Sequence, residues 1–333
     1  MTTRAYLFHG LHLSLLGEEA VLTALHARLG RFPAPPAQGA ADFRFEFHNV
    51  GEARQYGVPR PSGKGRSVLE PSLGGPVYFE ESQQLYLEIP GHGRALCDAQ
   101  SGRVQVSYPE AAGKGLWLLS HPLFTIPMAE LLKRRGLYMV HAAGLGISGK
   151  GLLIAGQSGA GKTTLALALL RAGFDFLADD TVFLTGGMND LRILAFPDEA
   201  DVTSQTLGFF PELHWLTHSP KPTERAKHAL CSIDAYGVTP CWYCAPEVII
   251  FPQPTGLPQS VITRMPKSEA LMELVCNVLR TEPRSSQAHL DALAGLVKHS
   301  RCFRLQTGRD FDRLPALLRS VMDQPTQSCP ELQ

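Results

Sequence analysis

Alternating apolar and polar residues predict β-strands in the first third of the chain. Phe43, Phe45 and Phe47 alternate with polar residues, which is the period of a strand with one buried face. A helix is expected over residues 17–29, and residues 54–76 lack periodicity and predict a mobile loop. The predicted strands cover residues 4–9, 43–50, 77–80, 84–89 and 103–108. These elements predict a small antiparallel sheet with one helix up to about residue 115.

The pattern changes near residue 116, where apolar residues recur at helical spacing as far as Arg135. This predicted helix ends on three basic residues, which suit the negative end of a helix dipole. Predicted strands and helices then alternate. Their ranges are 137–184 (strand, loop, helix, strand), 192–196 and 247–252 (strands), 267–280 and 285–299 (helices), 302–305 (strand) and 311–323 (helix). Such alternation predicts a second domain with a mainly parallel sheet covered by helices.

Composition and charge narrow the classes of protein that fit this pattern. Of 333 residues, 44% are hydrophobic and 19% are charged, which is typical of a globular chain. Lys plus Arg and Asp plus Glu both number 31, so neither nucleic acid nor an anionic membrane is an expected partner. The most apolar stretch, residues 116–132, contains His121, Pro122 and Pro127 and predicts no membrane span. Seven unevenly spaced cysteines and the lack of a signal-peptide pattern indicate a cytoplasmic location.

A glycine-rich segment after an apolar strand provides the first candidate site. Residues 156–163, GQSGAGKT, match the phosphate-binding pattern G-x-x-x-x-G-K-[ST], and a helix is expected over 164–172. A turn that binds nothing is the alternative, which this strand-loop-helix context disfavours. Lys162 is expected to reach the terminal phosphates of ATP or GTP, and the Thr163 hydroxyl to hold Mg²⁺. The predicted nucleotide-binding residues are Gly156, Gln157, Ser158, Gly159, Ala160, Gly161, Lys162, Thr163 and Thr164.

Two adjacent aspartates, Asp179 and Asp180, end the next apolar run. If that run lies beside the strand before the P-loop, both carboxylates come close to bound phosphates. One carboxylate can then hold Mg²⁺, and the other can accept the proton of an attacking hydroxyl. An exposed Asp-Asp turn is the alternative, but its position after a P-loop helix favours the site.

The ordered combination of these features resembles the C-terminal catalytic domain of the HPr kinase/phosphorylases, and in particular their HPr-kinase-like relatives. The matching features are Met139 with His141 on a strand, the apolar strand 151–155, the P-loop, the helix end at 171–173 and the segment 176–180. The resemblance implies an α/β P-loop kinase fold of the type shared with phosphoenolpyruvate carboxykinase. We therefore predict such a domain over residues 116–333 and a smaller N-terminal α+β domain over 1–115, with a role in substrate recognition.

The resemblance also implies roles for individual residues. Asp179 would be the general base for a serine hydroxyl, with Lys162 and His141 beside the phosphates. Thr163 and Asp180 would bind the metal. Taken alone, His141 would more often be a hydrogen-bonded core histidine.

Departures from the family limit what the resemblance implies. Thr164 stands where bifunctional members carry Glu, and the glycine-rich segment linked to phosphorolysis has no counterpart, so phosphorylase activity is not expected. Because residues 1–115 do not match the bifunctional enzymes, HPr is not predicted as the substrate. We predict an ATP-dependent kinase of a Ser or Thr hydroxyl in a peptide or small protein. Two alternatives stay open: a kinase of free serine or a sugar, and a nucleotide-switched peptide-binding module. The sequence also leaves homo-oligomer formation open.

Other residues support weaker hypotheses. His228, Cys231, Cys241 and Cys244 have spacing compatible with zinc, although packed reduced thiols are the favoured alternative.

Two basic segments and one polar stretch complete the candidates. Arg264 is a candidate contact for the γ-phosphate, but a solvated surface position is favoured. Lys64 and Arg66 lie in the predicted loop and are expected to remain in solvent. Residues 201–215 mix hydroxyl and aromatic side chains and are a candidate acceptor groove, with packing on the core as the alternative.

Overall fold

The structure, a computed structural model, describes most of the chain. The described ranges are 1–36, 39–51, 57–68, 75–187, 190–218, 227–276 and 278–324. The chain forms two compact units. The first contains Met1–Met139, Thr203–Ala229 and Asn277–Leu290, and the second contains Val140–Val202, Leu230–Cys276 and Asp291–Gln333.

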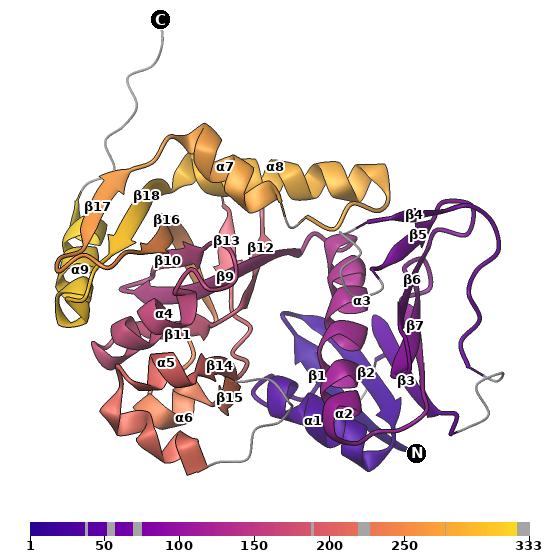
Figure 1. The fold of residues 1–333 in the computed structure, drawn as a ribbon. Helices are drawn as coiled ribbons and strands as arrows, with labels where there is room; N and C mark the ends of the chain where they lie inside the picture. The colour runs from indigo at the N-terminus through magenta and orange to yellow at the C-terminus, as the bar shows by residue number, and fades with distance from the viewer. Residues whose placement is uncertain are drawn as a thin grey trace, which may run out of the picture. The chain divides into compact units, whose positions relative to one another are not determined.

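The first unit is built on an eight-stranded mixed sheet (Figure 1). Across the sheet the strands are β1 (Thr2–Phe8), β2 (Leu11–Gly17), β3 (Phe43–Asn49), β8 (Arg103–Tyr108), β7 (Gly93–Asp98), β6 (Gln84–Ile89), β5 (Val77–Phe79) and β4 (Gly65–Ser67). Strand β3 pairs in parallel with both β2 and β8. The prediction of an antiparallel sheet is therefore wrong at β3, because helix α1 (Glu19–Leu29) supplies the crossover that a parallel pair requires.

Two helices follow this sheet in sequence and pack within the same unit. Helix α2 (Gly113–Ser120) contacts α1, and α3 (Pro122–Lys133) contacts β6 and β7. The sequence predicts one helix over 116–135, but the chain breaks at His121 because the residue before a proline is driven out of the helical region. Because α2 and α3 pack on α1, β6 and β7, the first unit extends to Met139, beyond the predicted boundary at residue 115.

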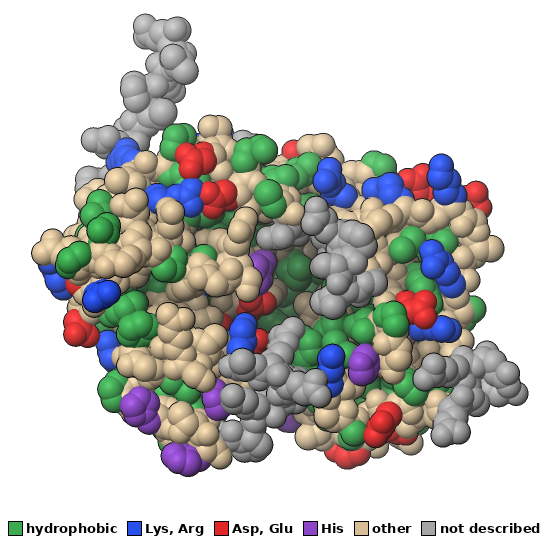
Figure 2. Space-filling view, in the orientation of Figure 1, with side chains coloured by type: hydrophobic (Ala, Val, Ile, Leu, Met, Phe, Trp, Pro, Cys, Tyr) green, Lys and Arg blue, Asp and Glu red, His purple; other side chains and the backbone are tan. Residues whose placement is uncertain are grey.

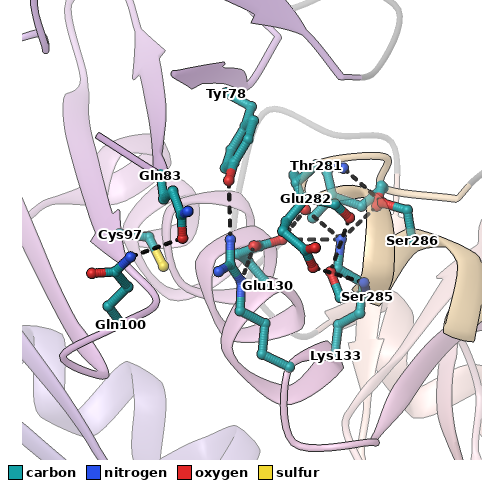
Figure 3. Close-up of polar contacts among 12 residues, drawn as sticks. Tyr78, Gln83, Cys97, Gln100, Glu130, Lys133, Thr281, Glu282, Ser285 and Ser286 are labelled. Carbon is teal, nitrogen blue, oxygen red and sulfur yellow. Dashed lines mark hydrogen bonds and ion pairs between the residues drawn. The ribbon is translucent and has the colours of Figure 1, made fainter. Parts of the chain in front are cut away.

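A buried polar cluster joins α3 to the segment before α8 (Pro283–His299) in the first unit (Figure 3). The side chains of Glu130 and Lys133 are each 1% exposed and form an ion pair of 3.1 Å. Lys133 Nζ also donates to Thr281 Oγ1 at 2.6 Å, and that hydroxyl donates to Glu130 Oε2 at 2.7 Å. Arg134 donates to the other Glu130 oxygen at 2.8 Å. Burial lowers the pKa of Lys133, and the Glu130 carboxylate opposes this shift.

The second unit is also built on an eight-stranded mixed sheet. Its strands are β9 (Tyr138–Ile147), β10 (Lys150–Ala155), β11 (Asp175–Ala178), β12 (Thr181–Thr185), β13 (Arg192–Leu194), β16 (Tyr243–Pro254), β17 (Val261–Arg264) and β18 (Arg301–Thr307). Strands β10, β16 and β18 are parallel neighbours. The predicted parallel sheet is confirmed for these three strands only, since β9 and β11 at one side and β17 at the other pair antiparallel.

Shorter elements complete the chain. Helix α4 (Lys162–Arg171) packs on β10, α6 (Ser232–Tyr236) and α9 (Leu314–Asp323). The remaining elements are β14 (Ala200–Thr203), β15 (Lys227–Leu230), α5 (Ser204–Leu207), η2 (Pro211–His218), α7 (Lys267–Val275) and η3 (Phe311–Arg313). Over the face drawn in Figure 2, basic and acidic side chains are intermixed. No helix within the described ranges has the length and apolar character needed to cross a membrane.

Candidate active site

The ends of several strands meet at one edge of the second sheet. The last residue of β10, Ala155, pairs with Ala142 of the antiparallel strand β9. His141, which precedes Ala142, and Gly156, which follows Ala155, therefore lie at the same level of the sheet. Strand β11 runs antiparallel to β9 and brings Asp179 and Asp180 to this edge. The P-loop after β10, the acidic doublet after β11 and His141 on β9 are thus brought together.

The glycine-rich loop 156–161 has backbone angles compatible with an anion-binding turn. Gly156, Gly159 and Gly161 have φ angles of 148°, 84° and 89°, a region in which glycine is favoured over any residue with a Cβ. No side chain caps the N-terminus of α4, so its first backbone N–H groups can bind an anion. Lys162 Nζ donates to the carbonyl oxygens of Gly156 and Gln157 at 2.8 and 3.3 Å, which folds its side chain over the loop.

Asp179 is buried directly beside the P-loop. Its Oδ2 accepts a hydrogen bond of 2.9 Å from Thr163 Oγ1. Its Oδ1 is buried and has no hydrogen-bond partner in the described part of the chain. Burial and the charge of Asp180 raise the pKa of Asp179 to about 7, against the lowering effects of the Thr163 hydroxyl and the Lys162 charge. An unpartnered carboxylate oxygen beside a phosphate loop is suited to bind a cation.

This buried carboxyl makes stability depend on pH. The pKa of Asp179 in the folded state, about 7, lies above its ordinary value of 3.8. The protonated carboxyl therefore contributes its full free energy to folding stability below pH 3.8, and this contribution is lost as the pH rises through 7. We expect Asp179→Asn to stabilise the nucleotide-free protein at pH 8 by about 1–4 kcal/mol, with little effect at pH 4. Urea denaturation at pH 4, 6 and 8 measures this. The same difference at all three pH values would show that ionisation of Asp179 is not its cause.

Asp180 differs from its neighbour in exposure and partner. Its side chain is 65% exposed, and its Oδ1 lies 3.2 Å from Nδ1 of His141, whose side chain is 34% exposed. The histidine is held by β9, the strand next to β10. The pair therefore presents an oriented carboxylate that solvent and a substrate can reach, whereas Asp179 faces the interior.

Asp201, the first residue of the predicted groove 201–215, lies near the phosphate site, a role that the sequence did not predict for it. It lies on β14, and its charge contributes to the raised pKa of Asp179, so it lies within electrostatic range of that carboxyl. The sequence places it in an acidic run with Asp198 and Glu199, but such a run follows no motif and is more often a solvated turn.

These residues fit a magnesium–nucleotide complex. Mg²⁺ takes oxygen ligands, usually one or two protein carboxylates together with substrate phosphates and water. The free Oδ1 of Asp179, the Thr163 hydroxyl and the glycine-rich loop supply such groups on one edge. Within the described residues, no three His, Cys, Asp or Glu side chains form a metal-binding group, and a Mg²⁺ shared with phosphates does not need one.

The zinc hypothesis gains no support from the structure. His228, Cys231, Cys241 and Cys244 all lie in the described ranges, where no metal-binding group of three or more residues is found. The three cysteines are free thiols, and Cys241 Sγ donates to the carbonyl of Tyr243 at 3.2 Å. Burial raises the pKa of Cys244 well above its usual value, so this thiol stays protonated.

The three basic candidates differ in their surroundings. Arg264 lies on β17, separated from β10 by β16 and β18, and is exposed, which contradicts the hypothesis of a γ-phosphate contact. Arg66 is exposed, as predicted, and its guanidinium also donates to the carbonyl oxygens of Arg280 and Thr281 at 3.3 and 2.9 Å. Lys64 is exposed, and part of the predicted loop 54–76 lies outside the described residues. The candidate groove 201–215 contains two exposed aromatic residues, Phe209 and Trp215.

An open cavity of about 750 Å³ belongs to the first unit. Its lining residues are Gly51, Gly91, His92, Pro109, Glu110, Ala112, Lys114 and Gly115. None of them belongs to the P-loop or to the acidic doublet, so this cavity is not the phosphate site.

Comparison with known proteins identifies the segment that carries the site. Residues 135–194 match the family model described as the HPr Serine kinase C-terminal domain, so the chain contains an HPr-serine-kinase-like segment. A solved structure, the Hpr(Ser) kinase/phosphatase from Coxiella burnetii, aligns with 55% of this chain and 92% of its own, at 14% identity and a TM-score of 0.31. At that TM-score the alignment adds nothing to the argument. No curated protein sequence matches the chain.

Proposed function

We propose that this chain is an ATP- or GTP-dependent kinase that transfers the γ-phosphoryl group to a Ser or Thr hydroxyl of a peptide or small protein. One observation carries the proposal: the P-loop, the Thr163–Asp179 hydrogen bond and the His141–Asp180 pair meet at one edge of one sheet. The family match over residues 135–194 supports kinase-type chemistry at that edge.

The residues nearest the phosphates would bind and neutralise them. The backbone N–H groups of the P-loop and the Lys162 ammonium group bind phosphate oxygens, with Thr164 in the first turn of the following helix. Thr163 and Asp179 would hold Mg²⁺, which would neutralise negative charge on the phosphates. Binding a cation at Asp179 favours its ionised form and so releases a proton near or below pH 7.

We assign the role of proton acceptor to Asp180 rather than to Asp179. Asp179 is buried and accepts a hydrogen bond from the Thr163 hydroxyl. The Asp180 carboxylate is exposed and is oriented by His141. The acceptor hydroxyl oxygen attacks the γ-phosphorus, and the bond between the γ-phosphorus and the β–γ bridging oxygen breaks. The hydroxyl proton passes to Asp180. This assignment exchanges the roles that the family resemblance implies for the two aspartates.

The proposed location is the cytoplasm, because the six described cysteines are free thiols, as expected in a reducing compartment. A peptide or small-protein acceptor is the proposed substrate class, and the family name itself refers to a serine kinase.

Transfer of a labelled phosphoryl group tests the proposal. The protein is incubated with γ-labelled ATP, Mg²⁺ and, separately, a Ser/Thr peptide library, free serine and sugars. We expect label on peptide, and none with Lys162→Ala, which removes the phosphate-binding ammonium group. Label on free serine or a sugar instead would make it a small-molecule kinase. Label found only in inorganic phosphate would contradict phosphotransfer to an alcohol and favour a nucleotide switch.

A further inference from the structure

Two loops form a platform beside the P-loop in the second unit. Strands β16 and β18 run parallel to β10, so their C-terminal ends lie at the edge that carries the P-loop (Figure 1). We call residues 254–260 and 307–310, which follow these strands, the strand-end platform. In open α/β sheets, ligands bind outside the C-terminal ends of the parallel strands.

The two parts of the platform are firmly joined. The backbone N–H of Thr255 donates to the carbonyl of Thr307 at 2.9 Å, and that of Arg309 donates to the carbonyl of Leu257 at 3.0 Å. Asp310 Oδ1 accepts hydrogen bonds from the backbone N–H and hydroxyl of Ser260 at 2.8 and 2.6 Å. These bonds fix the platform as a surface that needs no reorganisation to bind a ligand.

The platform lies next to the phosphate loop. A Cβ built on Gly161 would lie 3.6 Å from Pro254 Cγ, within van der Waals distance. Gly161 is the residue immediately before α4, where phosphate oxygens are expected to bind. A nucleotide bound at the P-loop therefore has the platform within reach of its remaining part.

The sheet order sets the direction of such a nucleotide. Strand β10 lies between β9 and β16, and the reacting groups lie on the β9 side: His141 on β9, and Asp180 after β11, which pairs with β9. The γ-phosphate must point toward those groups for transfer. The α-phosphate, ribose and base then extend to the opposite side of β10, over β16 and β18.

The platform offers suitable side chains at that position. Leu257 is 47% exposed, and Pro254, three residues earlier, is also exposed, so both present apolar surface to solvent. Arg309 is exposed at the end of β18, and no ion pair or side-chain hydrogen bond to it occurs in the described ranges. Apolar surface with an arginine, which stacks on planar π systems, is a fitting environment for a nucleobase.

We propose that the strand-end platform is the nucleoside subsite, in which Pro254 and Leu257 contact the base and the Arg309 guanidinium stacks on it. This inference rests on the proposed function, because it takes the nucleotide to bind at the P-loop. It assigns the nucleotide's orientation and the residues that distinguish a nucleoside triphosphate from a bare polyphosphate.

Two probes test the subsite: Mg-ATP and magnesium tripolyphosphate, which carries the phosphates without base or ribose. In calorimetric titrations, the double variant Leu257→Ala/Arg309→Ala is expected to bind Mg-ATP roughly tenfold more weakly than the wild type. Its affinity for tripolyphosphate is expected to be unchanged. Both side chains are exposed, and a thermal-unfolding scan confirms that the variant is folded.

Arg264→Ala and Met272→Ala are the matched controls. Both residues are exposed and belong to the same unit as the platform. Arg264 pairs with Phe303 of β18, which lies four residues, or about 13 Å, before Thr307 along that strand, so Arg264 is remote from the platform. These variants are expected to bind both probes like the wild type. Unchanged Mg-ATP affinity in the double variant, or equal losses for both probes, overturns the subsite and leaves the proposed kinase intact. A wild-type protein that binds neither probe overturns the proposed function itself.

Discussion

Asp180→Asn is expected to lower turnover by about 10²–10⁴-fold, the usual effect of losing a general base. The exposed Asp180 carboxylate, held 3.2 Å from His141, is the group that accepts the hydroxyl proton in this account. Asparagine keeps the shape but cannot take the proton. Affinity for Mg-ATP is expected to stay within about twofold of the wild type, because the P-loop and Asp179 are untouched. Single-turnover transfer of γ-label and calorimetry measure the two quantities.

Asp179→Asn is the informative comparison. It removes the buried carboxylate next to Thr163, so the Mg²⁺ concentration needed for half-maximal activity is expected to rise by about tenfold or more. Asp175→Asn, at the exposed opposite end of β11, is the control and is expected to change neither quantity. If Asp179→Asn lowers turnover with an unchanged Mg²⁺ requirement, the roles are those that the family resemblance implies, and our exchange of them is wrong.

Glu130→Ala is expected to lower the free energy of unfolding by about 3–5 kcal/mol, the largest stability effect we predict. Its carboxylate is 1% exposed and pairs with Lys133, Arg134 and the Thr281 hydroxyl. Removal leaves the buried Lys133 ammonium group without its counter-charge. Urea denaturation followed by tryptophan fluorescence measures the loss, since Trp117 lies in the same unit.

A surface ion pair of the same unit provides the control. Glu19 pairs with Arg4, and its side chain is 63% exposed, so Glu19→Ala is expected to cost less than about 1 kcal/mol. Replacing the cluster by Glu130→Leu/Lys133→Met should recover much of the loss, because matched apolar side chains remove both buried charges. A Glu130→Ala cost as small as that of Glu19→Ala would show that the buried pair does not stabilise the first unit.

Local patterns predicted the elements whose signal lies in a few neighbouring residues. The alternation of Phe43, Phe45 and Phe47 gave β3, where all three side chains are buried. The range 116–135 was predicted as one helix because its apolar spacing continues across Pro122, but Pro122 begins a second helix, α3.

Long-range pairing could not be predicted in the same way. The first unit takes residues 203–229 and 277–290 from distant parts of the chain, and no local pattern records that association. The parallel pairing of β3 with β8 likewise depends on residues almost 60 positions apart. These contacts are set by packing of whole faces rather than by any one segment.

The sequence indicated which residues belong to the candidate site, but not how those residues are arranged. Lys162, Thr163, Asp179, Asp180 and His141 all come from the sequence. The sequence did not predict which of the two aspartates is buried. Strand β11 has an irregularity between Phe176 and Ala178, and this breaks the period of two that would assign each residue to a face. Asp201 on β14 was predicted only as part of the groove 201–215, because no local pattern records that it lies within electrostatic range of Asp179.

A calorimetric titration of ATP into the wild-type protein, with and without Mg²⁺, tests the magnesium–nucleotide site most directly. We expect saturable binding at one site per chain that is tighter with Mg²⁺ and is lost in Lys162→Ala. Absence of binding under both conditions, or binding that Lys162→Ala leaves unchanged, would contradict a magnesium–nucleotide site built from the P-loop and the acidic doublet.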